Sequence, residues 1–190
     1  MKWLTGRGAA AALAVGLATI YGFGWRGLVL LLAFFVSSSL LTKGAGKRRT
    51  AQQVLANGGV AALAALAGNW GWFAGALAAA NADTWATEIG SHSSTPPRLI
   101  TNGKPVPAGT DGGMTVLGTS GGVAGAAFVG ALSWLMGQRH TLTVAVAGVV
   151  GMLVDSLLGA TVQGKTRWMD NDAVNLAATL TGAICAGLLA

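Results

Sequence analysis

The chain has 190 residues, of which 53% are hydrophobic and only 9% are charged. A water-soluble domain normally carries about 25% charged residues, so this composition excludes a protein whose surface is mostly in water. The net charge of +6 would suggest nucleic-acid binding in a soluble protein. In a membrane protein the excess of basic residues in cytoplasmic loops explains it, and we expect no nucleic-acid partner.

Hydrophobic runs separated by charged or Gly/Pro/Asn-rich segments predict one integral-membrane domain over residues 1–190, an all-α bundle of about seven (six to seven) transmembrane helices. The first run is short and follows Lys2 and Arg7, as in a signal peptide. No small-x-small cleavage site followed by a polar chain appears, so we keep it as a helix. In chain order the predicted helices are residues 8–23, 26–42, 51–68, 71–90, 113–136, 141–164 and 173–190.

The basic residues predict the orientation of these helices. In a seven-span arrangement ten of the twelve Lys and Arg residues lie on one side, and only Arg26 and Arg139 lie on the other. Positively charged loops stay in the cytoplasm, so the N-terminus is predicted to be cytoplasmic, in a bacterial inner (cell) membrane. The same side holds a basic hinge at residues 43–50 and a long segment at residues 91–112 with all four prolines. Loops this long in a compact protein are usually functional or disordered.

The small residues indicate how the helices pack. Gly118 with Gly122, and Gly121 with Gly125, form two overlapping G-x-x-x-G pairs. Such pairs let helix backbones approach closely in a bilayer. We favour packing inside the protein, and a homodimer interface stays open as the alternative. Cys185 is the only cysteine and the two histidines lack H-x-x-x-H spacing, which excludes disulfide frameworks and the usual zinc patterns.

The placement of the six acidic residues is the main functional clue. Asp83 and Glu88 lie in the predicted helix 71–90, and Asp155 lies in the predicted helix 141–164. Each lies in the half of its helix that is predicted to be nearer the cytoplasm. A carboxylate near mid-membrane costs about 2.5–3.5 kcal/mol, so three of them imply a metal ion, a basic partner or a water-filled cleft. Asp83 and Glu88 are about 140° apart around a helix and therefore need a wide polar face or a local break.

Groups suited to phosphate lie on the same predicted face. The sequence G-T-D-G-G at residues 109–113 opens a predicted helix, and glycine-rich turns at such positions expose backbone N–H groups to phosphate. The basic run facing it favours the same chemistry, although setting the topology alone would also explain that run. Mg²⁺ takes oxygen ligands and usually joins one or two carboxylates to substrate phosphates. Carboxylates, basic residues and a glycine turn together therefore predict Mg²⁺–phosphate chemistry.

Several segments resemble the integral-membrane family once named domain of unknown function 92, which includes transmembrane-protein-19-like proteins. The matching segments between Lys47 and Asn175 are K-R-R-T-A-Q-Q-V-L-A-N-G-G, A-A-A-N-A-D-T-W-A-T-E-I-G, P-P-R-L-I-T, V-P-A-G-T-D-G-G, V-D-S-L-L-G-A-T-V-Q and D-N-D-A-V-N. The family includes plant phytyl-phosphate kinase, so the resemblance implies a kinase that makes a prenyl diphosphate from a prenyl monophosphate. The implied cofactors are Mg²⁺ and a nucleoside triphosphate, CTP or ATP, as phosphate donor. No Walker A pattern is present, so nucleotide binding is expected to follow another mode.

The predicted site combines these observations. Asp83, Glu88 and Asp155 are predicted to be catalytic and, with Asp172, to bind Mg²⁺. The residues predicted to bind substrate or phosphate, or to complete the polar shell, are Lys43, Arg48, Arg49, Lys104, Asn57, Asp111, Gly112, Gly113 and Asn175. The expected partners are the lipid bilayer and a prenyl-phosphate lipid substrate.

Two other functions stay open on these residues alone. A transporter or channel would use the buried carboxylates as an ion or proton path, with a site near the midplane that is accessible from both sides. The inward bias of the acidic residues and the nearly uncharged outer loops favour an enzyme instead. A scaffold without chemistry leaves three buried carboxylates unexplained. Trp85, between Asp83 and Glu88, has two interpretations, a lining residue of a lipid groove or simple helix packing, and we favour packing.

Overall fold

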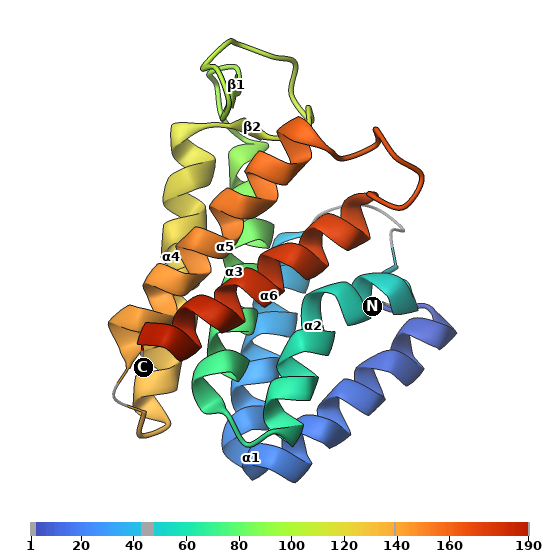
Figure 1. The fold of residues 1–190 in the computed structure, drawn as a ribbon, viewed down its shortest axis with the longest axis vertical. Helices are drawn as coiled ribbons and strands as arrows, with labels where there is room; N and C mark the ends of the chain where they lie inside the picture. The colour runs from blue at the N-terminus through green and yellow to red at the C-terminus, as the bar shows by residue number, and fades with distance from the viewer. Residues whose placement is uncertain (1–2, 43–47, 139, 190) are drawn as a thin grey trace.

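Six α-helices make up most of the computed structural model, which describes residues 3–42, 48–138 and 140–189 (Figure 1). The predicted all-α class is confirmed. A two-residue antiparallel hairpin, β1 (Arg98–Leu99) and β2 (Gly113–Met114), lies between the third and fourth helices. The helices are α1 (Gly6–Leu41), α2 (Ala51–Leu66), α3 (Trp70–Gly90), α4 (Val116–Leu135), α5 (Thr141–Thr161) and α6 (Asn171–Leu189).

Helix α1 consists of two arms that meet at a sharp bend. Gly24 has φ 58° and ψ −143°, a conformation that only glycine adopts without strain. The first arm runs beside α2, with Gly8 against the Arg49 carbonyl and Gly22 against the Ala65 carbonyl. The second arm returns to the starting face, where the Phe35 ring lies 5.8 Å from the ring of Trp3. The predicted helices 8–23 and 26–42 are thus the two arms of α1.

Helix α3 lies at the centre of the bundle. It contacts each of the other five helices, and its residues from Phe73 to Ala82 are all buried. Within the described ranges, α1, α4, α5 and α6 are long and apolar enough to cross a membrane, and α2 is a shorter apolar helix. A helix surrounded by other helices does not need an apolar surface facing lipid. This position allows α3 to carry Asn81, Asp83 and Glu88.

Glycine and alanine let the surrounding helices approach α3. A methyl group on Gly118 would lie 2.7 Å from the Ala86 carbonyl oxygen, and one on Gly125 would lie 3.1 Å from the Asn81 carbonyl oxygen. Gly121 packs on the side chain of Ile89, and Gly122 packs against Ala82 and Met152. All four glycines of the G-x-x-x-G pairs therefore pack inside the chain, as predicted.

Asn81 locks the first, third and fourth helices together by hydrogen bonds. Its side chain is fully buried, and its Oδ1 accepts hydrogen bonds from the hydroxyls of Ser37 (3.2 Å) and Ser38 (3.1 Å) of α1. Its Nδ2 donates to the carbonyl oxygen of Gly125 of α4 (2.9 Å). A buried polar group is tolerated when its hydrogen-bonding capacity is satisfied, so Asn81 fixes these three helices at one depth.

The predicted start of the helix at residue 113 is wrong. Helix α4 begins at Val116, because the Thr115 side chain caps it by accepting a hydrogen bond from the Gly118 N–H (2.9 Å). The two residues before the cap belong to β2, whose Gly113 and Met114 pair with Leu99 and Arg98. At the same end of the bundle, α5 ends at Thr161 rather than residue 164. Helix α6 begins at Asn171, where Asp170 Oδ1 accepts from the Ala173 N–H (2.9 Å).

We predict that Gly148→Val lowers the thermal midpoint (Tm) of the protein in detergent by several degrees. A Cβ at Gly148 would lie 2.8 Å from the Cβ of Ala78 and 2.9 Å from the Cβ of Ala126, and such overpacking costs about 1–3 kcal/mol. Gly16→Val is the matched control, because a Cβ at this helical glycine meets no atom within 4 Å. Equal midpoints for the two variants would contradict the close packing of α5 on α3.

Candidate functional site

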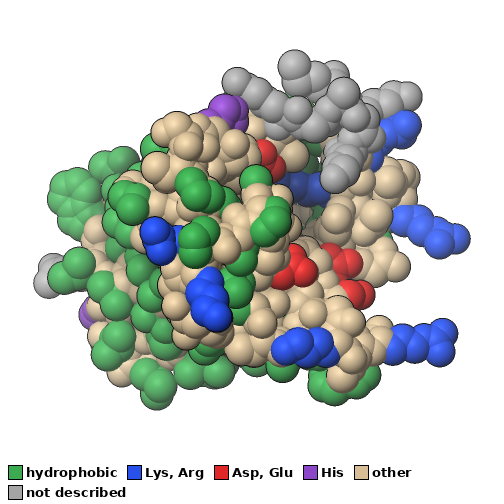
Figure 2. All heavy atoms as spheres, turned by 90° about the horizontal axis from the view of Figure 1, so that it is seen from above, with side chains coloured by type: hydrophobic (Ala, Val, Ile, Leu, Met, Phe, Trp, Pro, Cys, Tyr) green, Lys and Arg blue, Asp and Glu red, His purple; other side chains and the backbone are tan. Residues whose placement is uncertain are grey.

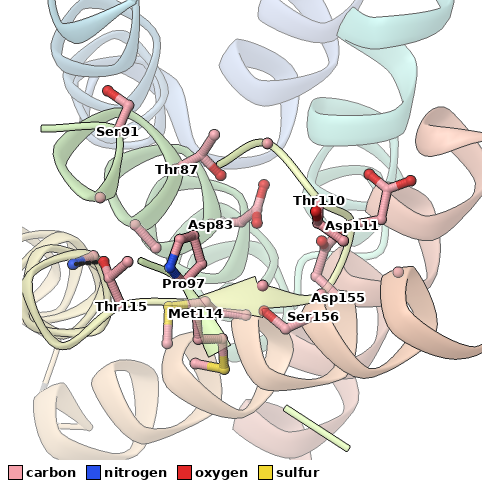
Figure 3. A pocket seen from close by; sticks show the side chains of 18 of the residues that line it. Asp83, Thr87, Ser91, Pro97, Thr110, Asp111, Met114, Thr115, Asp155 and Ser156 are labelled. Atoms are coloured by element: carbon pink, nitrogen blue, oxygen red, sulfur yellow. Dashed lines mark hydrogen bonds between the residues drawn. The ribbon is translucent and has the colours of Figure 1, made fainter. Parts of the chain in front are cut away.

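A polar cavity of about 310 Å³ lies at the end of the bundle that carries the hairpin. Its walls come from the C-terminal parts of α3 and α5, the N-terminal part of α4, and the segment that leads into β2 (Figure 3). Its lining residues are Asp83, Ala86, Thr87, Gly90, Ser91, Pro97, Ala108, Gly109, Thr110, Asp111, Gly112, Gly113, Met114, Thr115, Gly118, Thr119, Met152, Asp155, Ser156, Gly159, Gln163 and Asn171.

Two carboxyl groups from different helices meet in this cavity. Asp83 of α3 and Asp155 of α5 extend towards each other, and their side chains lie close enough to interact (Figure 3). The Oδ2 atom of Asp155 is buried and has no hydrogen-bond partner in the described part of the chain. A buried oxygen without a donor is costly, so this pair of carboxyls requires a proton or a cation from solution.

Every charged side chain in the described lining of the cavity is acidic. Asp111 lies near Asp155 and is the third carboxylate in the lining, where its Cβ approaches Gly159 of α5. No Lys, Arg or His is among the described residues that line the cavity. Viewed onto this end of the molecule, acidic side chains gather near the middle, and Lys and Arg side chains lie around them (Figure 2). The only charged side chains that a phosphate group would meet in the described lining are carboxylates, so a cation has to enter with it.

The glycine turn predicted from G-T-D-G-G forms one wall of the cavity. Gly109 and Gly112 have positive φ angles of 83° and 72°. Gly112 packs directly on α5, where a Cβ would lie 2.5 Å from the Ser156 carbonyl oxygen. This contact places the glycine-rich segment about one turn of α5 beyond Asp155. The turn does not open α4 as the sequence suggested, because β2 and the Thr115 cap lie between them.

Hydroxyl and amide side chains in the lining were missed in the sequence. Thr87 is four residues after Asp83, a spacing that places both on one face of α3. Ser156 directly follows Asp155. These two positions were recognisable from their neighbours, but the contributions of loop residues depend on how the chain folds over the helix ends. The additional polar lining residues are Thr87, Ser91, Thr110, Thr115, Thr119, Ser156, Gln163 and Asn171.

Glu88 lies outside this cavity lining and close to Arg49. Arg49 is half-buried, its guanidinium carbon lies 5.6 Å from the centre of the Phe35 ring, and its backbone exchanges hydrogen bonds with Trp3 and Thr5. Burial lowers the pKa of the Arg49 guanidinium, and the Glu88 carboxylate opposes this shift. The two residues therefore form an electrostatic contact between the basic hinge and α3, separate from the pair of aspartates.

Five further predicted site residues lie outside the described lining of the cavity. Arg48 and Lys104 are exposed, Asp172 is in the first turn of α6, and Asn175 is buried one turn further along. The Asn57 amide donates a hydrogen bond to the Gln53 carbonyl oxygen of its own helix (3.0 Å). Lys43 lies outside the described residues.

The predicted metal ligands Asp83, Glu88, Asp155 and Asp172 do not converge on one point. The described ranges contain no group of three or more His, Cys, Asp or Glu side chains arranged to hold a metal ion. What converges is the pair of Asp83 and Asp155, with Asp111 nearby.

Trp85 packs between helices. Its ring stacks on Phe128 of α4, with 5.6 Å between ring centres and 25° between ring planes, and it also contacts Gly125. Its Nε1 is buried and has no hydrogen-bond partner among the described residues. These contacts agree with the packing interpretation.

The fold and the site define a polytopic α-helical integral membrane protein with an acidic cavity open at one end of the bundle. The chain belongs to the integral membrane protein family DUF92, whose model matches residues 1–183. The resemblance seen in the sequence motifs is thereby confirmed.

Similar proteins occur in archaea, cyanobacteria and plants. An uncharacterized membrane protein of Methanocaldococcus jannaschii is 35% identical over 99% of this chain and 86% of its own length. Protein PGR of Arabidopsis thaliana is 34% identical over 74% of this chain, and the chloroplastic protein VTE6 of the same plant is 29% identical over 98%. Each alignment covers 65% of the plant protein's length. No solved structure matches this chain.

We predict that Glu88→Gln and Arg49→Gln each lower the Tm, because each leaves a partly buried charge without its neighbour. The double variant should lose less stability than the sum of the two single losses, since residues in contact are energetically coupled. The matched control replaces Arg49→Gln with Arg48→Gln, which removes an exposed arginine from the same hinge. The Tm losses of Glu88→Gln and Arg48→Gln should add. If the Tm losses of Glu88→Gln and Arg49→Gln also add, Glu88 and Arg49 do not interact.

Proposed function

We propose that this protein is a prenyl-monophosphate kinase. It transfers the terminal phosphoryl group of a nucleoside triphosphate, CTP or ATP, to a prenyl monophosphate and forms the prenyl diphosphate. The observation that carries the proposal is the pair of facing carboxyls, Asp83 and Asp155, in a cavity without a basic side chain in its described lining. Membership of a family that includes plant phytyl-phosphate kinase supports the same activity, as does the 29% identity to VTE6.

The donor groups in the cavity suit Mg²⁺. This ion is usually bound by one or two carboxylates, with water and substrate phosphates completing its coordination, so two aspartates are sufficient. The buried Asp155 Oδ2 lacks a hydrogen-bond donor among the described residues, as expected for an oxygen that holds a cation. Asp83 and Asp155 would hold the ion, and the hydroxyls of Thr87 and Ser156 lie in the same lining. When bound, Mg²⁺ supplies positive charge that neutralises the phosphate oxygens during transfer.

The reaction needs little proton chemistry from the protein. A phosphate monoester is largely a dianion at neutral pH, so its oxygen is already a nucleophile and requires no general base. That oxygen forms a bond to the terminal phosphorus of the nucleotide, the bond from this phosphorus to the bridging oxygen breaks, and the nucleoside diphosphate leaves. Catalysis of this kind depends on positioning and on stabilising charge. The glycine turn at residues 109–113 forms one wall of the cavity, and its packing on α5 holds that wall in place.

The packing beneath the cavity favours an enzyme over a transporter or channel. Residues of α3 from Phe73 to Ala82 are buried, and the fully buried Asn81 is satisfied by Ser37, Ser38 and Gly125. Met152 closes the floor between α4 and α5 with 1% of its surface exposed. An ion path from the aspartates to the opposite end would have to pass through this close-packed layer. The proposed chemistry needs access from one end only.

The proposed orientation places the cavity at the cytoplasmic boundary, where nucleotides are available. The two arms of α1 and helices α2 to α6 would then make seven crossings, with the N-terminus inside a bacterial inner membrane. The basic residues of the loops beside the cavity support this orientation. Two exposed positions at opposite ends of the bundle test it: Asn102 in the loop between β1 and β2, and His140 before α5.

We predict that, in a chain with Cys185→Ser, Asn102→Cys is protected from a membrane-impermeant thiol reagent added to intact cells. His140→Cys in the same background should be labelled, because His140 lies at the other end of the bundle and its side chain makes no capping hydrogen bond. Permeabilising the cells should make position 102 reactive. Labelling of position 102 in intact cells would place the cavity on the outer side.

We predict that Asp83→Asn and Asp155→Asn each lower kcat by at least about a hundredfold, because preorganised charge usually contributes more to such catalysis than any other effect. Folding should survive, since each change removes a charge that is costly inside a membrane protein. Asp170→Asn is the matched control: it removes an exposed charge on the same face, and the asparagine Oδ1 can still accept from the Ala173 N–H. Turnover per folded molecule, measured beside Tm, separates the outcomes. Variants that melt early but retain turnover would contradict the catalytic assignment.

A further inference from the structure

A second, shallower hollow of about 360 Å³ lies beside the acidic cavity. We call it the Arg98 hollow and define it by Arg98, Met114, Thr115, Val116, Thr119 and Ser120. Met114, Thr115 and Thr119 line the acidic cavity as well. The two spaces therefore share three lining residues, at the point where the hairpin meets the first turn of α4.

Arg98 gives this hollow a cation that the described lining of the acidic cavity lacks. Its backbone is fixed by pairing with Met114 across the hairpin, and its Nη1 donates a hydrogen bond to the Gly103 carbonyl oxygen (2.8 Å). A guanidinium carries five N–H donors, so most of them remain for a ligand. Thr119 belongs to the same lining, whose exposed surface is mostly apolar. A planar cation at the edge of an apolar surface is well suited to bind the phosphate group of a lipid.

The hollow opens towards the lipid-facing side of α4. Val116 is 84% exposed and Val123 is 46% exposed, although both are apolar side chains of a helix that is long enough to cross the membrane. Val116, Ser120, Val123 and Ala127 are all exposed, and their spacing of four, three and four residues puts them on one face of α4. A molecule with its phosphate at Arg98 would have its apolar part against this face. Such a molecule is a lipid with a single phosphate at its end.

We propose that the Arg98 hollow is the loading site for the lipid monophosphate, with the phosphate on Arg98 and the chain along Val116, Ser120 and Val123. The naming of this lipid as a prenyl monophosphate rests on the proposed kinase function. The lipid enters sideways from the bilayer, and the phosphate passes Thr115 and Thr119 to reach Asp83 and Asp155. The nucleotide enters the acidic cavity from the aqueous side, so the two substrates use different openings.

A binding measurement tests the loading site without requiring turnover. Purified protein in detergent is titrated with farnesyl monophosphate in the presence of Mg²⁺ and without nucleotide. Arg98→Gln should weaken binding about tenfold. The matched control, Arg167→Gln, removes an exposed arginine at the same end that lines neither hollow, and its Kd should stay within about twofold of wild type. Equal affinities for the Arg98→Gln and Arg167→Gln variants, or no binding by the wild type, would overturn the proposal.

Chain length distinguishes a lipid site from a general anion site. Ser120→Phe should fill the part of the hollow that holds the apolar chain and leave the space at Arg98 open. Binding of farnesyl monophosphate should weaken at least about fivefold, while binding of the five-carbon dimethylallyl monophosphate changes less than about twofold. Ala14→Phe, at an exposed position on α1, controls for an added aromatic side chain on the lipid-facing surface. Equal losses for both ligands in Ser120→Phe would contradict the placement of the chain. If ordinary phosphatidic acid competes as well as farnesyl monophosphate, the site is a general lipid contact and the proposal fails.

Failure of the kinase function would look different. If the wild type binds farnesyl monophosphate through Arg98 but forms no diphosphate with Mg²⁺ and any nucleoside triphosphate, the lipid site stands and the proposed reaction is wrong. If diphosphate forms and Arg98→Gln leaves KM for farnesyl monophosphate unchanged, the reaction stands and the loading site is wrong.

Discussion

The close approach of small residues to α3 is the constraint on which the rest of this structure depends. Glycines of α4 and α5 lie directly against the backbone and alanine side chains of α3, and a Cβ at Gly118 or Gly148 would collide with them. Helices in a membrane gain little from the hydrophobic effect between one another, so backbone proximity and dispersion must hold them together. The same proximity encloses α3 with five neighbours and permits it to carry polar residues. Without that enclosure Asp83 would face lipid.

This enclosure also sets the depth of the chemistry. Asn81 is satisfied by two hydroxyls of α1 and a carbonyl of α4, which closes the bundle just below Asp83. Above this layer α3 and α4 stay in contact at Gly118, and the glycine turn at residues 109–113 covers the space between α3 and α5. The carboxyls of Asp83 and Asp155 therefore lie between a packed layer and an aqueous opening. A position of this kind suits a reaction between a membrane lipid and a soluble nucleotide.

Much of the fold could be predicted from the sequence, because segments that cross a lipid bilayer must be mostly apolar. Apolar runs bounded by charged and turn residues located all the helical segments, including the two arms of α1, and the glycine pairs indicated internal packing. The first residue of α4 was misplaced because Gly113 and Met114 pair with residues about 15 positions earlier in the chain, so that the helix begins only after the Thr115 cap. Local sequence patterns carry no information on such a pairing.

Only part of the site could be predicted from the sequence, because the sequence does not show how each helix is rotated about its axis. A carboxylate in an apolar helix is conspicuous, so Asp83 and Asp155 stood out, and the glycine turn with Asp111 followed from its composition. Which carboxylates meet depends on how each helix is rotated, and that rotation directs Glu88 towards Arg49 instead of into the cavity. The hydroxyls of Thr87 and Ser156 were recognisable only by their spacing from Asp83 and Asp155, because Ser and Thr are common in membrane helices. Arg98 contributed only to the predicted topology, since its relation to α4 arises from the hairpin.

The most direct test of the central claim is phosphoryl transfer by the purified wild-type protein. The protein is incubated with Mg²⁺, a nucleoside triphosphate labelled in its terminal phosphate, and prenyl monophosphates of several chain lengths, and the lipid products are separated. The account predicts a labelled prenyl diphosphate that depends on the protein and disappears when EDTA removes Mg²⁺. Absence of labelled diphosphate with CTP, ATP, GTP and UTP, from protein that is folded and binds Mg²⁺, would contradict it.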